Sequence, residues 1–397
     1  MNRLLFMAAT ALSLSACAAV PDETLYVTGP AVMPTVSQSM PETMASMDPA
    51  DSILFWSDER RSAAFRDMES LFPGLEVSPA STPVRLPAGT PLPETVAAQA
   101  RQFMQETSAA GLIVLHDGDI VFEEYGMGLQ PDDRWTSFSV AKSFTSTLLG
   151  AAIADGSVES LDTPVTQIIP ELAGTAYDGV TVRQVATMTS GVAWNEDYTN
   201  PQSDVARMLA VTPVAGESQA ITYARTLRRE APAGEKFVYK TLETNLLGLL
   251  VEEATGQSLA QYSASKIVFP AGFEGGLFWM QDLTGGNIGG CCLSLTLRDY
   301  ARFGQFVLQG GGNFVPEGWF DEAGAPSVEF GGGAGYGYQW WTYPGGFGAQ
   351  GIFGQAITIV PEHDLVIAVV SNWPTATSSP HRAQFQGLAG RIIDAVE

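Results

Sequence analysis

One segment constrains the fold of this chain more than any other, the run from Trp135 to Gly150, which reads WTSFSVAKSFTSTLLG. Apolar residues lie on nearly every side of it, and Asp155-Gly156 follows as a usual helix end, so we expect a buried helix. Ser139 and Lys142 stand three residues apart on the first turn and share one face. A hydroxyl beside a base suits acyl transfer, because burial lowers the pKa of a lysine toward neutrality.

The Ser-x-x-Lys spacing is weakly specific by itself. It occurs a second time, from Ser263 to Lys266, although the chain has only four lysines. The second copy closes a polar helix and no apolar helix follows it, so we interpret Lys266 as a solvated cation at a helix end. The alternative for the first copy is an ordinary buried helix, but then Lys142 needs a partner, because an unpaired buried charge is costly.

Residues 1–17 predict an export signal, with one arginine, a short apolar run and then small residues. The last four, Leu14-Ser15-Ala16-Cys17, resemble the bacterial lipobox. The resemblance implies lipidation of Cys17 and a periplasm-facing lipoprotein of the cell envelope. By the same analogy, Ala18 in place of an acidic residue indicates the outer membrane. An ordinary signal peptide with an incidental cysteine is the alternative. Residues 18–50 are expected to form a flexible tether to a domain over residues 51–397.

Composition limits the partners. Lys and Arg number 20 against 43 Asp and Glu, a net charge of −23, which disfavours nucleic acid and anionic membrane surfaces. The three histidines, His116, His363 and His381, show no ligand spacing, so we expect no metal and no other cofactor. Cys291 and Cys292 are adjacent, which is awkward geometry for a disulfide, and we therefore expect no structural disulfide.

The order of the remaining patterns predicts an α+β fold. Strand patterns cover 111–125, with a hairpin turn at Asp117-Gly118, and return at 335–341, 351–360 and 365–371, while 232–239 suggests a turn and a short strand. Helical patterns cover 51–72, 181–191, 204–229, 245–256, 297–308 and about 382–396. We expect one antiparallel sheet, built from both chain ends and flanked by helices, beside a mostly helical lobe.

Five segments, in this order, resemble the serine β-lactamase-like hydrolases. They are Ser139-Val-Ala-Lys142, Thr187-Met-Thr-Ser-Gly191, Phe237-Val-Tyr239 ahead of Leu246-Leu-Gly248, Arg298-Asp-Tyr-Ala-Arg-Phe-Gly304 and Gly351-Ile-Phe-Gly-Gln355. The superfamily includes class C β-lactamases, DD-peptidases, esterases and 6-aminohexanoate-dimer hydrolase, and the loop from Trp194 to Tyr198 is most similar to the last branch. The resemblance covers about residues 50–397 and implies a β-lactamase/transpeptidase-like fold and a serine hydrolase.

The resemblance also implies roles for single residues. Ser139 would be the nucleophile, Lys142 its general base and Tyr239 the group that passes a proton to the leaving group. The backbone N–H groups of Ser139 and Ile352 would form the oxyanion hole. Tyr198 matches a loop tyrosine that contacts substrate, and Trp194, Glu196 and Gly351 are further candidates; for the loop residues, a purely structural anchor is the alternative. The resemblance places Cys291 and Cys292 near the site.

Two positions depart from the family pattern. Thr241 stands where the family has an asparagine, and the Lys-Thr-Gly motif of β-lactamases and DD-peptidases reads Ala349-Gln350-Gly351. The second change removes a cation that would meet a penicillin carboxylate. These departures favour cleavage of an amide or ester in a small molecule. β-Lactamase or DD-peptidase activity and a non-catalytic envelope binding protein remain alternatives, and the sequence specifies neither substrate nor oligomeric state.

Overall fold

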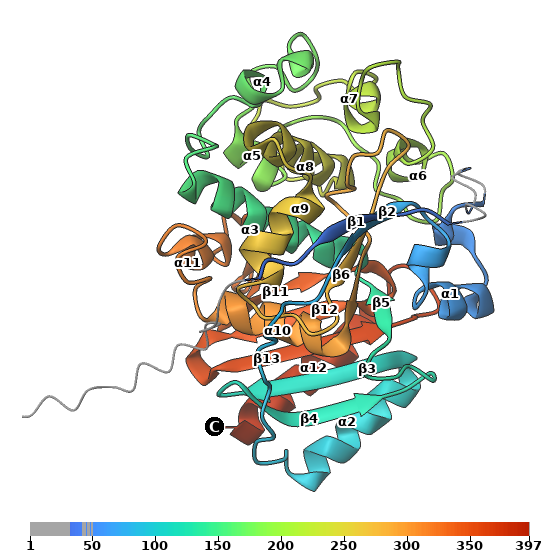
Figure 1. Cartoon of the computed structure of the whole chain (residues 1–397), viewed down its shortest axis with the longest axis vertical. Helices are drawn as coiled ribbons and strands as arrows, with labels where there is room; N and C mark the ends of the chain where they lie inside the picture. The colour runs from blue at the N-terminus through green and yellow to red at the C-terminus, as the bar shows by residue number, and fades with distance from the viewer. Residues whose placement is uncertain (1–31, 42–44, 46–47, 49–50, 397) are drawn as a thin grey trace, which may run out of the picture.

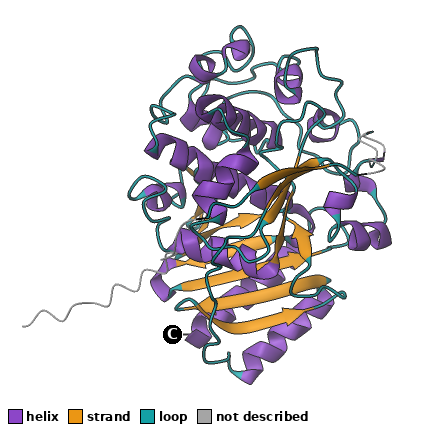
Figure 2. Ribbon diagram, viewed as in Figure 1, coloured by secondary structure: helices purple, strands orange, loops and turns teal. Residues whose placement is uncertain are grey.

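The structure is a computed structural model that describes residues 32–41, 45, 48 and 51–396. The signal segment and Cys17 lie outside these residues. Antiparallel sheets fill one half of the molecule and helices α4 to α8 the other (Figure 1, Figure 2). This arrangement confirms the α+β class. No helix of the described part of the chain is long and apolar enough to cross a membrane.

The larger sheet has eight strands in the order β4-β3-β13-β12-β11-β10-β9-β8, and every neighbouring pair is antiparallel. It joins the two ends of the domain, because β3 from the first part of the chain pairs with β13 from the last, as expected. Its strands are β3 (Ala109–His116), β4 (Asp119–Tyr125), β8 (Val328–Gly331), β9 (Ala334–Tyr336), β10 (Trp341–Tyr343), β11 (Gly346–Gln350), β12 (Ala356–Val360) and β13 (Leu365–Ser371).

The central strands of this sheet are buried on both faces, and their side chains alternate between two cores. Leu112 and Val114 pack with α2 (Glu94–Glu106) and α12 (Ser379–Val396). Ile113 and Leu115 belong to the main core on the other face, where α10 (Leu297–Leu308) covers the sheet. Helices on both faces therefore hold the sheet rigidly beneath the site.

We expected one sheet, but the structure has a second one, of five strands in the order β1-β2-β6-β7-β5. Its strands are β1 (Val36–Ser39), β2 (Gly74–Val77), β5 (Arg134–Thr136), β6 (Leu277–Met280) and β7 (Leu293–Thr296). Strand β1 falls within the segment that we expected to be a flexible tether, so that expectation is wrong at residues 36–39. The reason is non-local, since Val36 pairs with Val77 and Ser39 with Gly74.

The helical lobe consists of short helices around one long one. They are α4 (Val165–Ile168), η5 (Pro170–Leu172), α5 (Val182–Ala186), α6 (Asp204–Met208), α7 (Gln219–Ala224), α8 (Thr241–Thr255), α9 (Leu259–Ser263) and the π-helix η6 (Ala264–Val268). Outside the lobe lie η8 (Pro361–His363) and α11 (Trp319–Ala323). Helix α8 packs against α3 and presents its N-terminus to the site described below.

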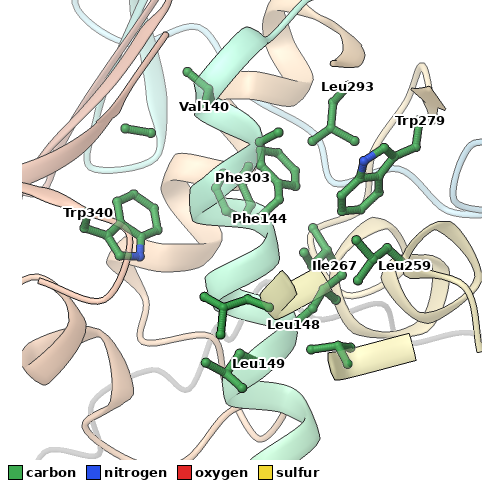
Figure 3. Packing of buried hydrophobic residues seen from close by; sticks show 14 of the residues in the cluster. Val140, Phe144, Leu148, Leu149, Leu259, Ile267, Trp279, Leu293, Phe303 and Trp340 are labelled. Carbon is green, nitrogen blue, oxygen red and sulfur yellow. The ribbon is translucent and has the colours of Figure 1, made fainter. Parts of the chain in front are cut away.

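Helix α3 (Ala141–Ala154) is the centre of the main core, as the sequence predicts. Phe144 stacks on Phe303 of α10, with ring centroids 3.7 Å apart. Figure 3 shows Trp340 on one side of α3 and Trp279 on the other. Burial on all sides fixes the helix, and therefore also the side chains of its first turn.

Several segments differ from the sequence-based expectations. The strand expected over 335–341 is two short ones, β9 and β10, and the strand expected over 351–360 begins only at Ala356. The expected helix over 51–72 is three short ones, η2 (Ile53–Phe55), α1 (Asp58–Ala64) and η3 (Met68–Ser70), because Ser52 and Ser57 each cap a new start. The region 204–229 contains only α6 and α7, which Ser203 and Ser218 cap. Residues 232–239 form no strand; Gly234 and Val238 only donate isolated bonds to Thr189 and Met188.

Candidate active site

Ser139 lies on a tight turn between a strand and the central helix. Strand β5 ends at Thr136, η4 (Phe138–Val140) follows, and α3 begins at once. Phe138 has a φ of +43°, a conformation that costs a bulky residue about 1–3 kcal/mol. Packing holds it there, with the Phe65 and Phe353 rings 4.9 Å and 5.4 Å away. Phe138 and Val140 are buried, whereas Ser139 between them is partly exposed, so the turn presents one hydroxyl.

Lys142 is 1% exposed, on the first turn of α3. Its Nζ donates to the carbonyl oxygen of Gly290 at 2.8 Å and to Thr241 Oγ1 at 3.1 Å. Burial lowers the pKa of Lys142 to about 8, while the negative charge of Glu196 acts in the opposite direction. Two acceptors match the two N–H groups of a neutral amine. The nitrogen lone pair is then free to take a proton.

Tyr239 lies next to this amine, just before α8. The Lys142 Nζ is 5.3 Å from the centroid of the Tyr239 ring. That ring stacks on Trp341 at 5.6 Å and meets the edge of Tyr336 at 6.0 Å. Burial raises the pKa of Tyr239 above its usual range, and a hydrogen bond with the Ser139 side chain opposes that rise. The structure therefore brings Ser139, Lys142 and Tyr239 together.

Glu196 joins this group through a network that the sequence did not indicate. Its carboxylate accepts hydrogen bonds from the Thr241 hydroxyl and from the Thr241 N–H, the latter at 3.0 Å. It also accepts from the Tyr198 hydroxyl at 2.8 Å and from the indole N–H of Trp194. Thr241 therefore links the amine of Lys142 to a carboxylate 45 residues away in the chain.

The segment after β11 lies against the turn that carries Ser139. A Cβ on Gly351 would be 2.6 Å from the carbonyl oxygen of Ser137, so only glycine fits here. Ile352, the next residue, opens η7 (Ile352–Gly354) and lines the same cavities as Ser139. Ser139 and Ile352 therefore border the same two cavities, and the oxyanion hole formed by their N–H groups stays a prediction.

Two cavities meet at Ser139, Tyr198 and Ile352, which line both. The first is apolar and has a volume of about 60 Å³; Thr241, Gly290 and the two cysteines also line it. The second is an open cleft of about 660 Å³ that Glu196, Tyr239, Gly351 and Arg382 line. Trp194 lines neither cavity, and its indole instead holds Glu196.

The sulfur atoms of Cys291 and Cys292 are bonded to each other. The expectation of no structural disulfide is therefore wrong. The backbone of Cys292 makes the bond between adjacent cysteines possible, because its φ of +71° lies in the left-handed region. An extended backbone would instead send the two neighbouring side chains to opposite sides. The pair lines the apolar cavity beside Ser139, where the family resemblance had placed it.

The second Ser-x-x-Lys copy lies away from this site. The Ser263 hydroxyl donates to the carbonyl oxygen of Ala260 at 2.8 Å. Lys266 forms an ion pair with Asp155 at 2.8 Å, so it is not simply the solvated cation that we expected. Neither residue lines either cavity at Ser139, and they serve below as controls.

Comparison with known proteins places the chain in a family. The β-lactamase family model matches residues 96–391. The chain belongs to the β-lactamase family. It is 32% identical over 364 residues to 6-aminohexanoate-dimer hydrolase from Paenarthrobacter ureafaciens, covering 83% of this chain and 89% of that protein. The resemblance to the serine β-lactamase-like hydrolases is thus confirmed, and the relatives are hydrolases.

Solved structures of this family share the fold. A provisionally named 6-aminohexanoate-dimer hydrolase from Bacillus anthracis superposes with a TM-score of 0.73 at 22% identity, over 84% of this chain and 93% of that one. A class C β-lactamase gives a TM-score of 0.59 at 17% identity, over 77% and 96%. At these identities the likeness supports the architecture only.

Within this family site, the departures noted in the sequence have structural consequences. Thr241, in place of an asparagine, offers Lys142 a hydroxyl that also binds Glu196. Gln350 donates to the Tyr343 hydroxyl at 2.9 Å, so no cation stands at the Ala349-Gln350-Gly351 segment. Sequence reasoning missed Arg382 of α12, which lines the cleft with its guanidinium 4.8 Å from the Trp373 ring centroid. Nothing in the periodicity of α12 distinguishes this arginine from a surface residue.

The described residues contain no group of three or more His, Cys, Asp or Glu side chains arranged to hold a metal ion. The polar groups around Ser139 instead form a serine, a lysine and a tyrosine backed by one carboxylate. Such a set can remove a proton from a hydroxyl and return it to a leaving group.

Proposed function

We propose that this chain is a serine hydrolase that cleaves an amide or ester of a small molecule through an acyl-enzyme on Ser139. The observation that carries the proposal is the environment of Lys142, a 1%-exposed amine with two acceptors beside a partly exposed serine. A lysine of lowered pKa is a competent general base near neutral pH. A purely structural helix has no need of an amine at this place.

In the proposed reaction, Lys142 accepts the proton of the Ser139 hydroxyl as Oγ bonds to the carbonyl carbon. The carbonyl oxygen becomes an anion between the N–H groups of Ser139 and Ile352. The C–N or C–O bond then breaks, and Tyr239 gives its proton to the leaving atom and recovers one from Lys142. Water attacks the acyl carbon, gives a proton to the same relay, and Ser139 Oγ leaves with a proton.

Two observations favour a linear amide or ester over a β-lactam. The relative that is 32% identical is named 6-aminohexanoate-dimer hydrolase, and an amide joins the two halves of such a dimer. The Ala349-Gln350-Gly351 segment also lacks the family's lysine for the carboxylate of a penicillin, and Arg382, which lines the same cleft, comes from α12 instead. A β-lactamase or DD-peptidase reaction, and binding without catalysis, are the outcomes that would replace this proposal.

The test is acylation by a panel of substrates. We expect an initial burst of p-nitrophenol from p-nitrophenyl esters, a matching mass increase on the protein, and turnover of linear amides. The Ser139→Ala variant should show neither burst nor mass increase, whereas Ser263→Ala should behave as the unmodified protein. Equal or faster hydrolysis of benzylpenicillin would contradict the preference, and a folded protein that neither releases p-nitrophenol nor gains mass would contradict catalysis.

We also propose that the mature protein is a lipoprotein of the cell envelope, anchored through Cys17. The support is the Leu14-Ser15-Ala16-Cys17 sequence alone. Expressed in a Gram-negative host, the full chain should incorporate an alkyne-labelled fatty acid and sediment with outer membranes. The Cys17→Ser variant should lose the label and become releasable; labelling that persists in this variant would contradict the proposal.

A further inference from the structure

Ser139 stands at the meeting point of two cavities with different chemistry, and this difference bears on the substrate. We propose that the apolar cavity walled by the bonded Cys291–Cys292 pair is the subsite for the acyl half of the substrate, and that it selects an uncharged, apolar acyl group. The inference rests on the proposed acyl-enzyme function and names its substrate class.

The position of Tyr239 indicates which half of the substrate occupies which cavity. A group that donates a proton to the leaving atom must lie within hydrogen-bond reach of that atom. Tyr239 lines the open cleft and does not line the apolar cavity. The leaving group therefore occupies the cleft. The acyl group, which is bonded to Ser139 Oγ, therefore occupies the apolar cavity, the other cavity that Ser139 lines.

The lining of the apolar cavity determines what it accepts. Its apolar walls come from several separate parts of the chain, among them Ile53 and Phe72 near the N-terminal helices, Leu209 after α6 and Met280 at the end of β6. Its polar lining side chains are uncharged hydroxyls, and none of its lining residues carries a charge. An ionised acyl end would lose its hydration there without gaining a partner.

The bonded cysteines complete this wall. In the bonded form neither sulfur carries a proton or can become a thiolate, so the surface toward the acyl group stays apolar and unreactive. The pair directly follows Gly290, whose carbonyl oxygen accepts from Lys142 at 2.8 Å. The wall of the acyl subsite and the anchor of the base are therefore one short segment.

The open cleft has the opposite character. Glu196, Asp197 and Arg382 line it, and its volume of about 660 Å³ is about eleven times that of the apolar cavity. Charges of both signs and an open rim accept polar leaving groups of varied size. We therefore expect strict selection on the acyl side and broad tolerance on the leaving side.

The first test uses the unmodified protein and matched p-nitrophenyl esters. The proposal predicts that hexanoyl ester is hydrolysed with a kcat/KM at least 100-fold above that of the 6-ammoniohexanoyl ester, which has the same chain and one charge. In this respect the chain would differ from the relative named for a 6-aminohexanoate dimer, whose acyl half is a 6-aminohexanoyl group. A change of similar charge in the leaving group, at constant acyl group, should alter kcat/KM less than tenfold. Acyl discrimination below tenfold would overturn the proposal.

The second test uses the same substitution in each cavity. Ala206→Leu fills the apolar cavity, which Ala206 lines at 2% exposure, and Ala383→Leu adds the same bulk to the cleft. We expect Ala206→Leu to lower kcat/KM for hexanoyl ester at least tenfold while acetyl ester changes less than threefold. Ala383→Leu should leave this acyl preference unchanged. The reverse pattern would overturn the assignment.

Labelling of Ser139 by a small fluorophosphonate separates failure of the subsite from failure of the proposed function. If all variants are labelled but the acyl profile does not change with Ala206→Leu, only the subsite assignment fails. If the unmodified folded protein is not labelled, the proposed function fails, and the subsite with it. Should Ala206→Leu not fold, the charge discrimination of the unmodified protein decides.

Discussion

The amine of Lys142 donates a hydrogen bond to the Thr241 hydroxyl across 3.1 Å, and the same hydroxyl binds the carboxylate of Glu196. This contact joins the first turn of α3 to the first residue of α8 and to the loop before α6. Burial lowers the pKa of Lys142 and Glu196 raises it, so two opposing influences set the pH at which the base is neutral.

The unmodified protein should show the titration of this base in its activity. Because Lys142 must be neutral to accept a proton, kcat/KM should increase with pH through about 8 and level off above it. Lys142→Met, which keeps the volume without the amine, should reduce kcat/KM by about 10²–10⁴-fold. The pH profile of an ester substrate measures both, with Lys266→Met as the control. A profile that is flat from pH 6 to 9 would contradict the role of Lys142.

Removal of the Glu196 charge should shift that profile. Since the carboxylate raises the pKa of Lys142, Glu196→Gln should move the midpoint to lower pH. The plateau should fall about 3–10-fold, because the hydrogen bonds to Thr241 lose their charge.

Asp197→Asn is the matched control for Glu196→Gln, because Asp197 is adjacent and exposed and its side chain binds Thr199. Its midpoint should equal that of the unmodified protein. If Asp197→Asn shifts the midpoint as much as Glu196→Gln, the effect is general electrostatics and the specific link fails.

Thr241→Val tests the bridging hydroxyl at nearly constant volume. The variant removes one acceptor from Lys142 and one donor from Glu196, and we expect kcat to fall about tenfold, equivalent to about 1.4 kcal/mol. Thr241→Ser should restore most of the loss. Steady-state kinetics on one ester measures this; equal losses in the valine and serine variants would point to packing instead of the hydroxyl.

A buried ion pair near the site predicts a pH-dependent stability. Glu243 and Lys240 are fully buried with 3.2 Å between their charged atoms. Burial raises the pKa of Glu243 from 4.5 to about 7, against the influence of Lys240 and Ser190. Between pH 4.5 and 7, therefore, Glu243 binds more protons in the folded protein than in the unfolded chain. The contribution of Glu243 to the free energy of unfolding consequently decreases as pH rises from about 4.5 to about 7.

Denaturant unfolding at pH 5 and pH 8 measures this contribution. Glu243→Gln should reduce the difference in unfolding free energy between the two pH values by on the order of 2–4 kcal/mol. At pH 5 the variant should be about as stable as the unmodified protein, because Glu243 is largely protonated there and glutamine is likewise uncharged. Glu253→Gln, on the exposed side of the same helix, should change neither quantity. An unchanged pH difference in Glu243→Gln would refute the raised pKa.

Local sequence patterns predicted the helices and strands whose formation depends mainly on neighbouring residues. The apolar surround of α3 predicted its burial, and the three-residue spacing placed Ser139 and Lys142 on one turn. The apolar runs in β3 and β13, with the turn at Asp117-Gly118, predicted the strands, and the chain order predicted a sheet from both ends. The helix and the individual strands depend on residues close in sequence, whereas the pairing of β3 with β13 was predicted from the order of the elements.

Features that depend on distant contacts, or on a single unusual backbone angle, could not be predicted from the sequence. Strand β1 reads Val36-Ser-Gln-Ser39, too polar to indicate a strand, and exists because β2 offers it an edge. The Cys291–Cys292 bond depends on one positive φ at Cys292. Glu196 reaches Thr241 across 45 residues, and no periodicity predicts such a contact. The central helix was therefore predictable, while most of the electrostatics around its first turn was not.

The most direct test of the central claim is intact mass spectrometry after the chain without residues 1–17 is treated with a fluorophosphonate. The account predicts one adduct per chain, located on Ser139, none on the Ser139→Ala variant, and much slower labelling of Lys142→Ala than of Lys266→Ala. An unlabelled but folded domain, or an adduct that persists in Ser139→Ala, would contradict it.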